Sequence, residues 1–264
     1  MEIFLLCRPD YFSVEYSINP WMIGEKVDHQ LMINQWENLR QTIEHLGAKV
    51  EIIKQIKSLP DMTFAANSGV VKDGNFVLSR MKYKERQGES KHYRAWFKSR
   101  NYNVIDLMPG VSFEGCGDVL VYNNCLIGGY GFRSDKKALE ITANSLNLNL
   151  FDLKLSDPRY YHLDTCFCRV SKDKAIYYPN AFHAGEIKKL QNVINLIPVS
   201  EEDARLFMCN SMLVGDVLMI PSSKSEIGKK IRNKIGIKTC TVNVSEFLKS
   251  GGSIQCLCLK IKDS

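Results

Sequence analysis

The sequence predicts an α/β fold in which five similar units close into a ring around a central axis, a five-bladed propeller with pseudo-fivefold symmetry. Three observations support this prediction. A two-stranded hairpin followed by a helix and a third strand recurs about every 45 residues. One unit is split between the two ends of the chain, as expected for a closed ring. Each unit is too small to bury its own apolar face, so neighbouring units must cover it.

Four of the five units are continuous in the sequence. Runs of β-branched and apolar residues alternate with amphipathic segments in the order strand, strand, helix, strand. The first unit is expected at residues 69–71, 75–79, 89–100 and 102–106, and the second at 118–122, 125–128, 135–145 and 148–153. The third is expected at 166–171, 175–178, 184–195 and 196–200, and the fourth at 209 onward, 217–220, 223–234 and 237–242.

The fifth unit takes one strand, residues 254–261, from the C-terminus and a strand, helix and strand, residues 2–7, 28–46 and 49–53, from the N-terminus. Asp28 is suited to cap its helix, and Gly47 is suited to end it. The apolar stripe expected to face the core is Leu31, Trp36, Leu39, Ile43 and Leu46. Because no Pro/Gly/Ser-rich linker interrupts the chain, we expect residues 1–264 to form a single domain.

Composition narrows the class of protein. The 264 residues are 45% hydrophobic and 24% charged, as in soluble globular chains and unlike disordered or collagenous ones. The chain has no run of about 20 apolar residues, and its start does not resemble a signal peptide, so no membrane partner is expected. The nine cysteines, an odd number, are expected to be reduced thiols in a cytoplasmic protein.

Residues 80–100 hold eight Lys or Arg and two Glu, which accounts for the whole net charge of +6. Aromatic residues are interleaved with these cations, as in a surface that binds nucleic acid through phosphate contacts and base stacking. The stretch is also typical of a helix whose Tyr93, Trp96 and Phe97 face the core. In a third interpretation, an arginine binds a substrate carboxylate through a bidentate fork. We favour the last two interpretations and expect no nucleic-acid partner.

A polar or reactive residue precedes or begins the first strand of every unit: Asn67, Glu114, His162, Asn210 and Cys256. Their separations are 47, 48, 48 and 46 residues, so a pseudo-fivefold ring would point all of them at its axis. A thiol, an imidazole and a carboxylate among them are the parts of cysteine nucleophilic catalysis. Taken singly, Cys256 is more typical of a small core residue, and His162 is more typical of a half-buried, hydrogen-bonded histidine.

Two further acids, Asp118 and Asp164, accompany this set and indicate a cationic ligand. A planar guanidinium offers five N–H donors, and its charge beside a thiol favours the thiolate. The alternative is that both acids only cap turns. Zinc is disfavoured because the cysteine pairs at 166/168 and 256/258 have one intervening residue rather than the usual two to four, so we expect no metal.

Four segments carry a resemblance to a known superfamily: residues 60–67 (PDMTFAAN), 113–118 (FEGCGD), 162–165 (HLDT) and 251–256 (GGSIQC). Together they are similar to the guanidino-group-modifying enzymes, five-bladed α/β propellers that include arginine deiminase, dimethylargininase, glycine amidinotransferase and arginine dihydrolase. The likeness extends over nearly the whole chain. It implies a small-molecule guanidino substrate such as arginine and a reaction without a cofactor.

The resemblance also implies a role for each matching residue. Cys256 would attack the guanidinium carbon. His162, held in place by Glu114, would protonate the departing nitrogen and then activate water. Asp164 and Asp118 would grip the guanidinium.

Arg86, within residues 85–89 (ERQGE), and Arg133, within residues 131–133 (GFR), resemble the family's clamps for the amino acid carboxylate. One position departs from the pattern, because Asn67 stands where deiminases and dimethylargininases usually carry an aspartate in a Phe-x-x-Asp motif. Asparagine removes a charge and adds a donor, which makes a neutral ureido group easier to hold. This asparagine and residues 16–22 (YSINPWM), which would place Asn19 in a mobile loop over the site, are similar to arginine dihydrolases. Those enzymes take arginine through citrulline to ornithine, two ammonia and carbon dioxide.

We therefore expect a cysteine hydrolase of arginine, with dihydrolase favoured over deiminase. Dimethylargininase and amidinotransferase remain alternatives, although an amidinotransferase would need a second amine site that the sequence does not show. A protein that only binds arginine is the non-enzymatic alternative, and the intact Cys256, His162 and Glu114 argue against it, because a binder requires no nucleophile. A homo-oligomer stays open, since a blade that packs on a partner looks like any other amphipathic helix.

Overall fold

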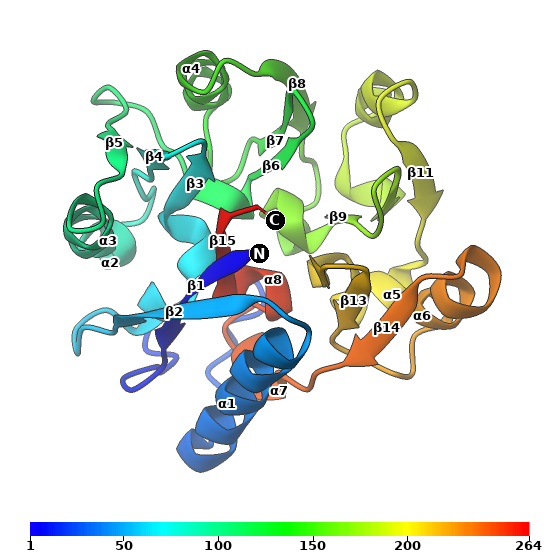
Figure 1. Cartoon of the computed structure of the whole chain (residues 1–264), viewed down its shortest axis with the longest axis horizontal. Coiled ribbons are helices and arrows are strands. Elements are labelled where there is room, and N and C mark those ends of the chain that lie inside the picture. Colours follow the sequence, from blue (N-terminus) through cyan, green and yellow to red (C-terminus); the bar gives the residue numbers. More distant parts are fainter. Residues whose placement is uncertain (264) are drawn as a thin grey trace.

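The computed structural model describes residues 1–263 and contains five three-stranded sheets arranged as blades around one axis (Figure 1). The middle strand of each sheet pairs antiparallel with one neighbour and parallel with the other. Blade 1 consists of β3 (Gly69–Lys72), β4 (Asn75–Leu78) and β5 (Asn103–Ile105), and blade 2 of β6 (Val119–Tyr122), β7 (Cys125–Tyr130) and β8 (Asn149–Lys154). Blade 3 consists of β9 (Phe167–Arg169), β10 (Lys174–Tyr177) and β11 (Asn195–Pro198), and blade 4 of β12 (Met212–Val214), β13 (Val217–Ile220) and β14 (Lys238–Thr241). The predicted five-bladed α/β propeller is confirmed.

Blade 5 is built from both ends of the chain and closes the ring. The C-terminal β15 (Cys258–Lys262) pairs antiparallel with β1 (Ile3–Arg8), and β1 pairs parallel with β2 (Lys49–Lys54). The two termini consequently lie side by side near the axis (Figure 1). The split unit expected from the sequence is therefore present.

The helix of blade 5, α1 (His29–His45), has the termini expected of it. Asp28 accepts a hydrogen bond from the Leu31 amide at 3.0 Å, and Gly47 follows the helix with φ 89°. The apolar stripe was predicted partly wrongly, because Leu31 is 41% exposed. The buried face consists of Met32, Gln35, Trp36, Leu39 and Ile43. Met32 lies four residues before Trp36 and thus on the same face, whereas Leu31 is rotated by about 100° from it.

The helical segments of the other blades differ in length. Blade 1 has α2 (Lys84–Gln87) and α3 (Glu89–Lys98), blade 2 has α4 (Lys136–Ser145), and α5 (Glu201–Arg205) and α7 (Ser245–Leu248) connect later blades. The helix expected at residues 184–195 is wrong, since the structure has only a 3-10 helix, Glu186–Leu190. Within that segment only Leu190 is buried, so no apolar stripe extends it. The helix expected at residues 223–234 is a short α6 (Glu226–Lys230) continued by a π-helical turn, Ile231–Ile235, which Gly236 ends.

The C-terminal strand also begins later than predicted. Residues 254–261 were expected to form one strand, but Ile254–Leu257 form the helical turn α8 and the strand begins at Cys258. Cys256 therefore lies in a turn that precedes the strand, whereas Cys258 begins the strand itself and is fully buried. All nine cysteines fall within the described residues 1–263 and are free thiols.

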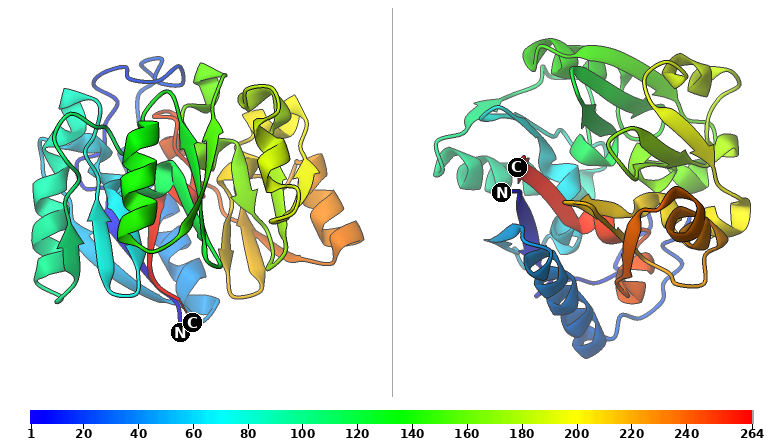
Figure 2. Two further views of the ribbon diagram at one scale, coloured as in Figure 1. Left: turned by 90° about the horizontal axis from the view of Figure 1, so that it is seen from above. Right: turned by 45° about the vertical axis from the view of Figure 1, so that its right-hand side comes forward.

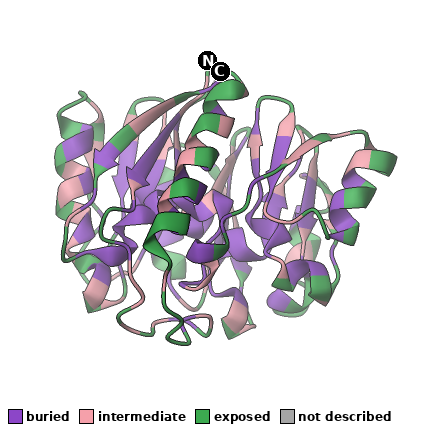
Figure 3. Ribbon diagram, turned by 90° about the horizontal axis from the view of Figure 1, so that it is seen from below, coloured by how far each residue is buried: buried purple, intermediate pink, exposed green. Residues whose placement is uncertain are grey.

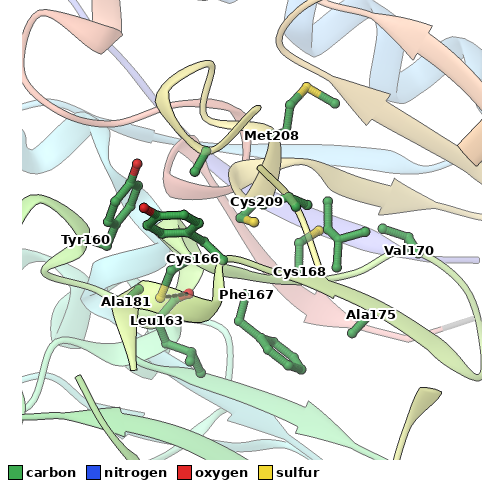
Figure 4. Packing of buried hydrophobic residues seen from close by; sticks show 14 of the residues in the cluster. Tyr160, Leu163, Cys166, Phe167, Cys168, Val170, Ala175, Ala181, Met208 and Cys209 are labelled. Atoms are coloured by element: carbon green, nitrogen blue, oxygen red, sulfur yellow. Dashed lines mark hydrogen bonds between the residues drawn. The ribbon is translucent and has the colours of Figure 1, made fainter. Parts of the chain in front are cut away.

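The core fills the spaces between neighbouring blades, where the strands are buried and the outer helices keep exposed faces (Figure 3). One such cluster joins blade 3 to blade 4 through Leu163, Cys166, Phe167, Met208 and Cys209 (Figure 4). In the basic stretch, Tyr93 and Phe97 are fully buried and Trp96 is 9% exposed. These rings face the core, as in the helix interpretation, and are not exposed for stacking on bases.

The two ends of the propeller axis carry different structures. In the left-hand view of Figure 2, both termini lie at the lower end, and the blue segment that follows β1 lies at the upper end. Short helical turns precede the first strand of each blade, and the hairpin turns between first and second strands lie at the strands' other ends. Within residues 1–263, no helix is long and apolar enough to cross a bilayer.

Candidate active site

Each of the five equivalent polar residues belongs to, or directly precedes, the helical turn at the start of its blade. Asn67 lies in the turn Ala65–Ser68, and Asn210 ends the turn Met208–Asn210. Glu114 and His162 are the residues before the turns Gly115–Gly117 and Leu163–Thr165. Together with Cys256 in α8, all of them are at most 3% exposed. The recurrent turn thus brings to one end of the axis side chains that are far apart in the sequence.

Glu114 connects two of the predicted site residues. Its Oε2 lies 2.9 Å from His162 Nε2 and accepts a hydrogen bond from Arg133 Nη1 at 2.8 Å. Burial alone would raise the pKa of Glu114, but the charge of Arg133 and the hydrogen bond with His162 hold this pKa well below its usual value. The carboxylate is therefore ionised at neutral pH and orients the imidazole through Nε2, leaving Nδ1 as the ring nitrogen for other partners.

The ring of His162 lies against a glycine that leaves it no spare room. A Cβ on Gly117 would come within 2.4 Å of Asn67 Nδ2 and within 3.1 Å of His162 Nδ1. Only glycine at this position lets the asparagine of blade 1 and the histidine of blade 3 lie so close to one backbone.

Cys256 is held by two side chains from other blades. Its Sγ donates to Asp164 Oδ2 at 3.2 Å and accepts from Asn210 Nδ2 at 3.1 Å, while its backbone amide donates to Asn210 Oδ1 at 3.2 Å. Burial, and then the charge of Asp164, raise the pKa of this thiol well above its usual value. Among the residues described, no hydrogen bond joins the thiol to His162. A nucleophile and a general acid that act on opposite sides of a bound carbon need no such contact.

The two acids expected to bind a cation have different surroundings. Asp164 is 5% exposed, burial raises its pKa to about 7, and its Oδ1 has no hydrogen-bond partner within residues 1–263. Asp118 already accepts from Ser134 Oγ at 2.6 Å and from the Leu163 amide at 3.2 Å, and burial raises its pKa to about 6. Asp164 thus retains a free acceptor, whereas both oxygens of Asp118 are engaged by the protein.

The predicted carboxylate clamps, Arg86 and Arg133, are both 3% exposed and paired with acids. Arg86 forms a bidentate pair with Glu89, with distances of 2.8 and 2.9 Å, and donates to Asn67 Oδ1 at 2.9 Å. Arg133 is bound by Glu114 and donates through Nη2 to the Ile18 carbonyl at 2.9 Å. It has the larger number of uncommitted N–H donors, since its Nε and one N–H of each terminal nitrogen remain.

Residues 16–22 cover the upper end of the axis. Asn19 Nδ2 donates to the Ser250 carbonyl at 3.1 Å, and Trp21 Nε1 donates to the Arg159 carbonyl at 2.7 Å. The cavity below them measures about 10 Å³, the space of one water molecule, and its wall includes Asn19, Asn67 and Cys256. The structure is therefore a closed form of the site, and Asn19 is part of its wall.

Sequence reasoning missed three residues at this site. Asn210 was placed on the axis by its spacing but was given no role, although it contacts the thiol directly. Asp61 lies in the motif of residues 60–67 and accepts from Tyr16 and Ser250 at 3.0 and 3.1 Å. Tyr161, next to His162 in the chain, donates to the Gly251 carbonyl at 2.8 Å. Motif membership was the available signal for Asp61, whereas Tyr161 had none.

Gly252 explains part of the motif at residues 251–256. A Cβ on Gly252 would lie 2.2 Å from Cε1 of Phe64, so no larger residue fits without moving that ring. Within the described part of the chain, no group of three or more His, Cys, Asp and Glu side chains is arranged to hold a metal ion.

Comparison with known proteins shows which family the chain belongs to. Over 98% of its length the chain is 39% identical to the bifunctional arginine dihydrolase/ornithine cyclodeaminase ArgZ of Synechocystis sp., but it spans only 37% of that relative. It is 36% identical to the N(G),N(G)-dimethylarginine dimethylaminohydrolase of Mycobacterium tuberculosis, covering 98% of this chain and 85% of that one. The crystal structure of the N-terminal domain of ArgZ, a cysteine-to-serine mutant bound to substrate, superposes with a TM-score of 0.95 at 38% identity and covers 100% of this chain and 99% of that domain.

A more distant structure, a dimethylarginine dimethylaminohydrolase adduct, has a TM-score of 0.85 at 15% identity, covers 98% of this chain and 99% of that one, and shows the fold alone. The family model described as "N,N dimethylarginine dimethylhydrolase, eukaryotic" matches residues 11–262. With nearly its whole length matched and its five blades carrying the side chains described above, the chain belongs to the N,N-dimethylarginine dimethylhydrolase family.

Proposed function

We propose that this chain is a cysteine-dependent arginine dihydrolase, which converts L-arginine to ornithine, two ammonia and carbon dioxide through covalent adducts on Cys256. The 39% identical relative is named an arginine dihydrolase, and its solved forms include a cysteine-to-serine mutant with bound substrate and an asparagine-to-serine mutant with a covalent reaction intermediate. We assign Cys256 and Asn67 to these two roles in this chain.

In the first step the guanidinium binds beside Asp164 and the thiol. Its positive charge offsets the carboxylate charge that holds the pKa of Cys256 high, so binding of substrate itself favours the thiolate. The Sγ attacks the guanidinium carbon, and a terminal nitrogen leaves as ammonia after it takes a proton from His162. A water molecule deprotonated by the same imidazole then cleaves the thiouronium adduct and gives bound citrulline.

In the second step Cys256 attacks the ureido carbon of citrulline, and the remaining terminal nitrogen leaves as ammonia. Water cleaves the resulting thiocarbamate, and the carbamic acid that forms breaks down to ornithine and carbon dioxide. The sum balances as arginine plus two water giving ornithine, two ammonia and carbon dioxide.

The observation that carries the dihydrolase assignment is the free donor of Asn67. Its Oδ1 faces the donor-only Arg86, which fixes the orientation of the amide, and its Nδ2 is buried without a hydrogen-bond partner in the described chain. A ureido group differs from guanidinium by an oxygen that accepts hydrogen bonds. An aspartate at this position would offer only acceptors, whereas Asn67 Nδ2 can donate to that oxygen and hold citrulline for the second attack.

Substrate entry requires the closed site to open, because a cavity of about 10 Å³ cannot hold an amino acid. Movement of the segment around Ile18 and Asn19 breaks the bond between Arg133 and the Ile18 carbonyl at 2.9 Å. The freed guanidinium donors of Arg133 can then bind the substrate carboxylate, with Arg86 as the second clamp. In this scheme Asp118 acts mainly by fixing the Leu163 backbone beside His162 and adds charge to the cation site.

The deciding experiment is to incubate the protein with L-arginine, and separately with L-citrulline, and to quantify ornithine, citrulline and ammonia. Cys256→Ser is the control. Ornithine with two ammonia per arginine, absent from the control, is the expected result. Citrulline with one ammonia would make the protein a deiminase, and no turnover of either compound would overturn the proposal.

Dimethylarginine hydrolysis is the second candidate, because the matching family model and the Mycobacterium tuberculosis relative both carry that name. Release of dimethylamine from N(G),N(G)-dimethylarginine, at a higher kcat/KM than that of arginine turnover, would favour it.

The nine free thiols also support the proposal of a reducing, cytoplasmic location. The closure of the ring by β1 and β15 supports a single domain.

A further inference from the structure

A second cavity lies at the other end of the propeller axis. It measures about 860 Å³ and is lined by residues of the first strand of every blade, β3, β6, β9, β12 and β15. Its wall also includes the hairpin residues Asp73, Gly74 and Asn123, together with Lys262 and Asp263 near the C-terminus. The cavity therefore extends along the axis from the end that carries the termini.

The wall of this cavity includes a residue that contacts the proposed nucleophile. Asp164, whose Oδ2 accepts the hydrogen bond of the Cys256 thiol at 3.2 Å, is part of its wall. Cys116 and Gln255, neighbours in sequence of the site residues, also line it. One residue therefore contacts the nucleophile and belongs to the wall of the axial cavity.

The proposed reaction requires a route for water and ammonia that is separate from the opening used by the amino acid. Two water molecules must reach Cys256, and two ammonia molecules must leave it, while the amino acid backbone remains bound at the upper end of the axis. The upper cavity measures only about 10 Å³ and is covered by Ile18 and Asn19. A substrate held by Arg86 and Arg133 would obstruct that opening, so exchange through it would require release of the intermediate citrulline.

We propose that the axial cavity is a conduit through which water enters and ammonia leaves while the amino acid stays bound. This inference rests on the proposed function. Hydrolysis of each adduct consumes one water drawn from the cavity, and each ammonia departs uncharged past side chains such as Val71 and Leu213, which line the wall. Asp164, which belongs to the wall of the cavity and accepts the hydrogen bond of the thiol, lies where the conduit meets the site.

The experiment narrows the conduit without touching the site. Val71 and Leu213 are half-buried, lie on blades 1 and 4, and contact none of the proposed catalytic groups through a hydrogen bond in the described chain. Val71→Trp, Leu213→Trp and the double variant add bulk to the wall, and the corresponding alanine variants are the matched controls. Far-UV circular dichroism and Tm show which variants fold.

Two quantities are measured with L-arginine: steady-state kcat, and the fraction of enzyme that carries a covalent adduct, by intact-mass spectrometry after an acid quench. We expect the double tryptophan variant to lose about tenfold in kcat, each single variant to lose less, and the adduct fraction to rise in all three. The alanine variants should match wild type. A change in folding alone would lower kcat without raising the adduct fraction.

Folded tryptophan variants with wild-type kcat and adduct fraction would overturn the conduit. If the double variant does not fold, the two single variants carry the test. The proposed function is tested separately by the products of the wild-type enzyme. A wild type that yields citrulline would refute the dihydrolase, yet its single hydrolysis still consumes one water, so the adduct measurement would still decide on the conduit.

Discussion

The two ends of the propeller axis are made from the same five blades, but they differ in almost every physical property. At the upper end, helical turns present buried, ionisable side chains to a cavity of about 10 Å³, and arginines there are paired with buried acids. At the lower end, strand side chains surround about 860 Å³, with residues of the hairpin turns on the wall. Fivefold repetition explains why side chains converge at all. The identity of the turn, rather than of the strand, decides which end can perform chemistry.

The largest expected effect comes from removing the nucleophile at the upper end. We expect Cys256→Ser to lower kcat for arginine by at least about 10⁴-fold with little change in Tm. Cys258→Ala is the matched control, because Cys258 is fully buried two residues away on β15 and should stay within about threefold of wild type. Residual activity of Cys256→Ser near that of wild type would move the nucleophile elsewhere.

Glu114→Gln should have the next largest effect. Loss of this charge leaves His162 without an ionised partner and Arg133 without its counter-ion at 2.8 Å. We expect kcat to fall by about 10²–10⁴-fold and the free energy of unfolding to fall by about 3 kcal/mol. Glu140→Gln, on the surface helix α4, serves as the control for loss of an acid. Kinetics and thermal unfolding measure both quantities, and an unchanged kcat would contradict the orienting role of Glu114.

Asn67→Asp tests the feature that separates one hydrolysis from two. The variant retains an acceptor for Arg86 but loses the Nδ2 donor. We expect about a tenfold lower ratio of ornithine to citrulline from arginine, with the rate of the first ammonia release less affected. Product ratios from a quenched time course give the answer. An unchanged ornithine yield would refute the role given to Asn67.

The smallest expected effect is a pH dependence set by Asp164. Its pKa, raised to about 7 by burial, makes the carboxylate protonate as pH falls through neutrality, so it then binds a cation less well. We expect kcat/KM for arginine to fall about threefold between pH 7.5 and pH 6.5. Asp164→Asn should remove this dependence along with most of the activity, and a wild-type profile that stays flat would contradict the assignment.

The raised pKa of Asp164 also predicts how the free energy of unfolding depends on pH. An acid whose pKa is higher in the folded chain than in the unfolded chain costs stability when it is ionised. This cost is absent below about pH 4 and complete above about pH 7. Asp164→Asn should therefore raise the free energy of unfolding by about 2–4 kcal/mol at pH 8, and the gain should vanish as pH approaches 4. Denaturant unfolding at the two pH values measures it.

Much of the fold could be predicted because blades follow local rules. Alternating apolar residues located most strands, and the spacing of Asn67, Glu114, His162, Asn210 and Cys256 located the site. Helices with weak apolar stripes, such as the segment Glu186–Leu190, could not be assigned from pattern alone. The hydrogen-bond partners of individual side chains could not be predicted either, because they depend on tertiary packing.

Cys256 illustrates this limit. Cys256 was expected in a strand, whereas the structure has a helical turn and a thiol between Asp164 and Asn210. Both contacts bridge blades, with separations of 92 and 46 residues along the chain. No local sequence pattern predicts a contact between residues so far apart in the chain. Only the repeat period indicated that Asn210 and Cys256 lie close together.

Closure of the ring by β15 has a consequence for when the protein becomes reactive. Cys256 precedes the strand that seals blade 5, and β15 is held there by its pairing with β1. A chain in which β15 is not paired with β1 does not hold Cys256 between Asp164 and Asn210, the two side chains that bond its thiol. The same pairing of β15 with β1 therefore closes the propeller and positions the proposed nucleophile.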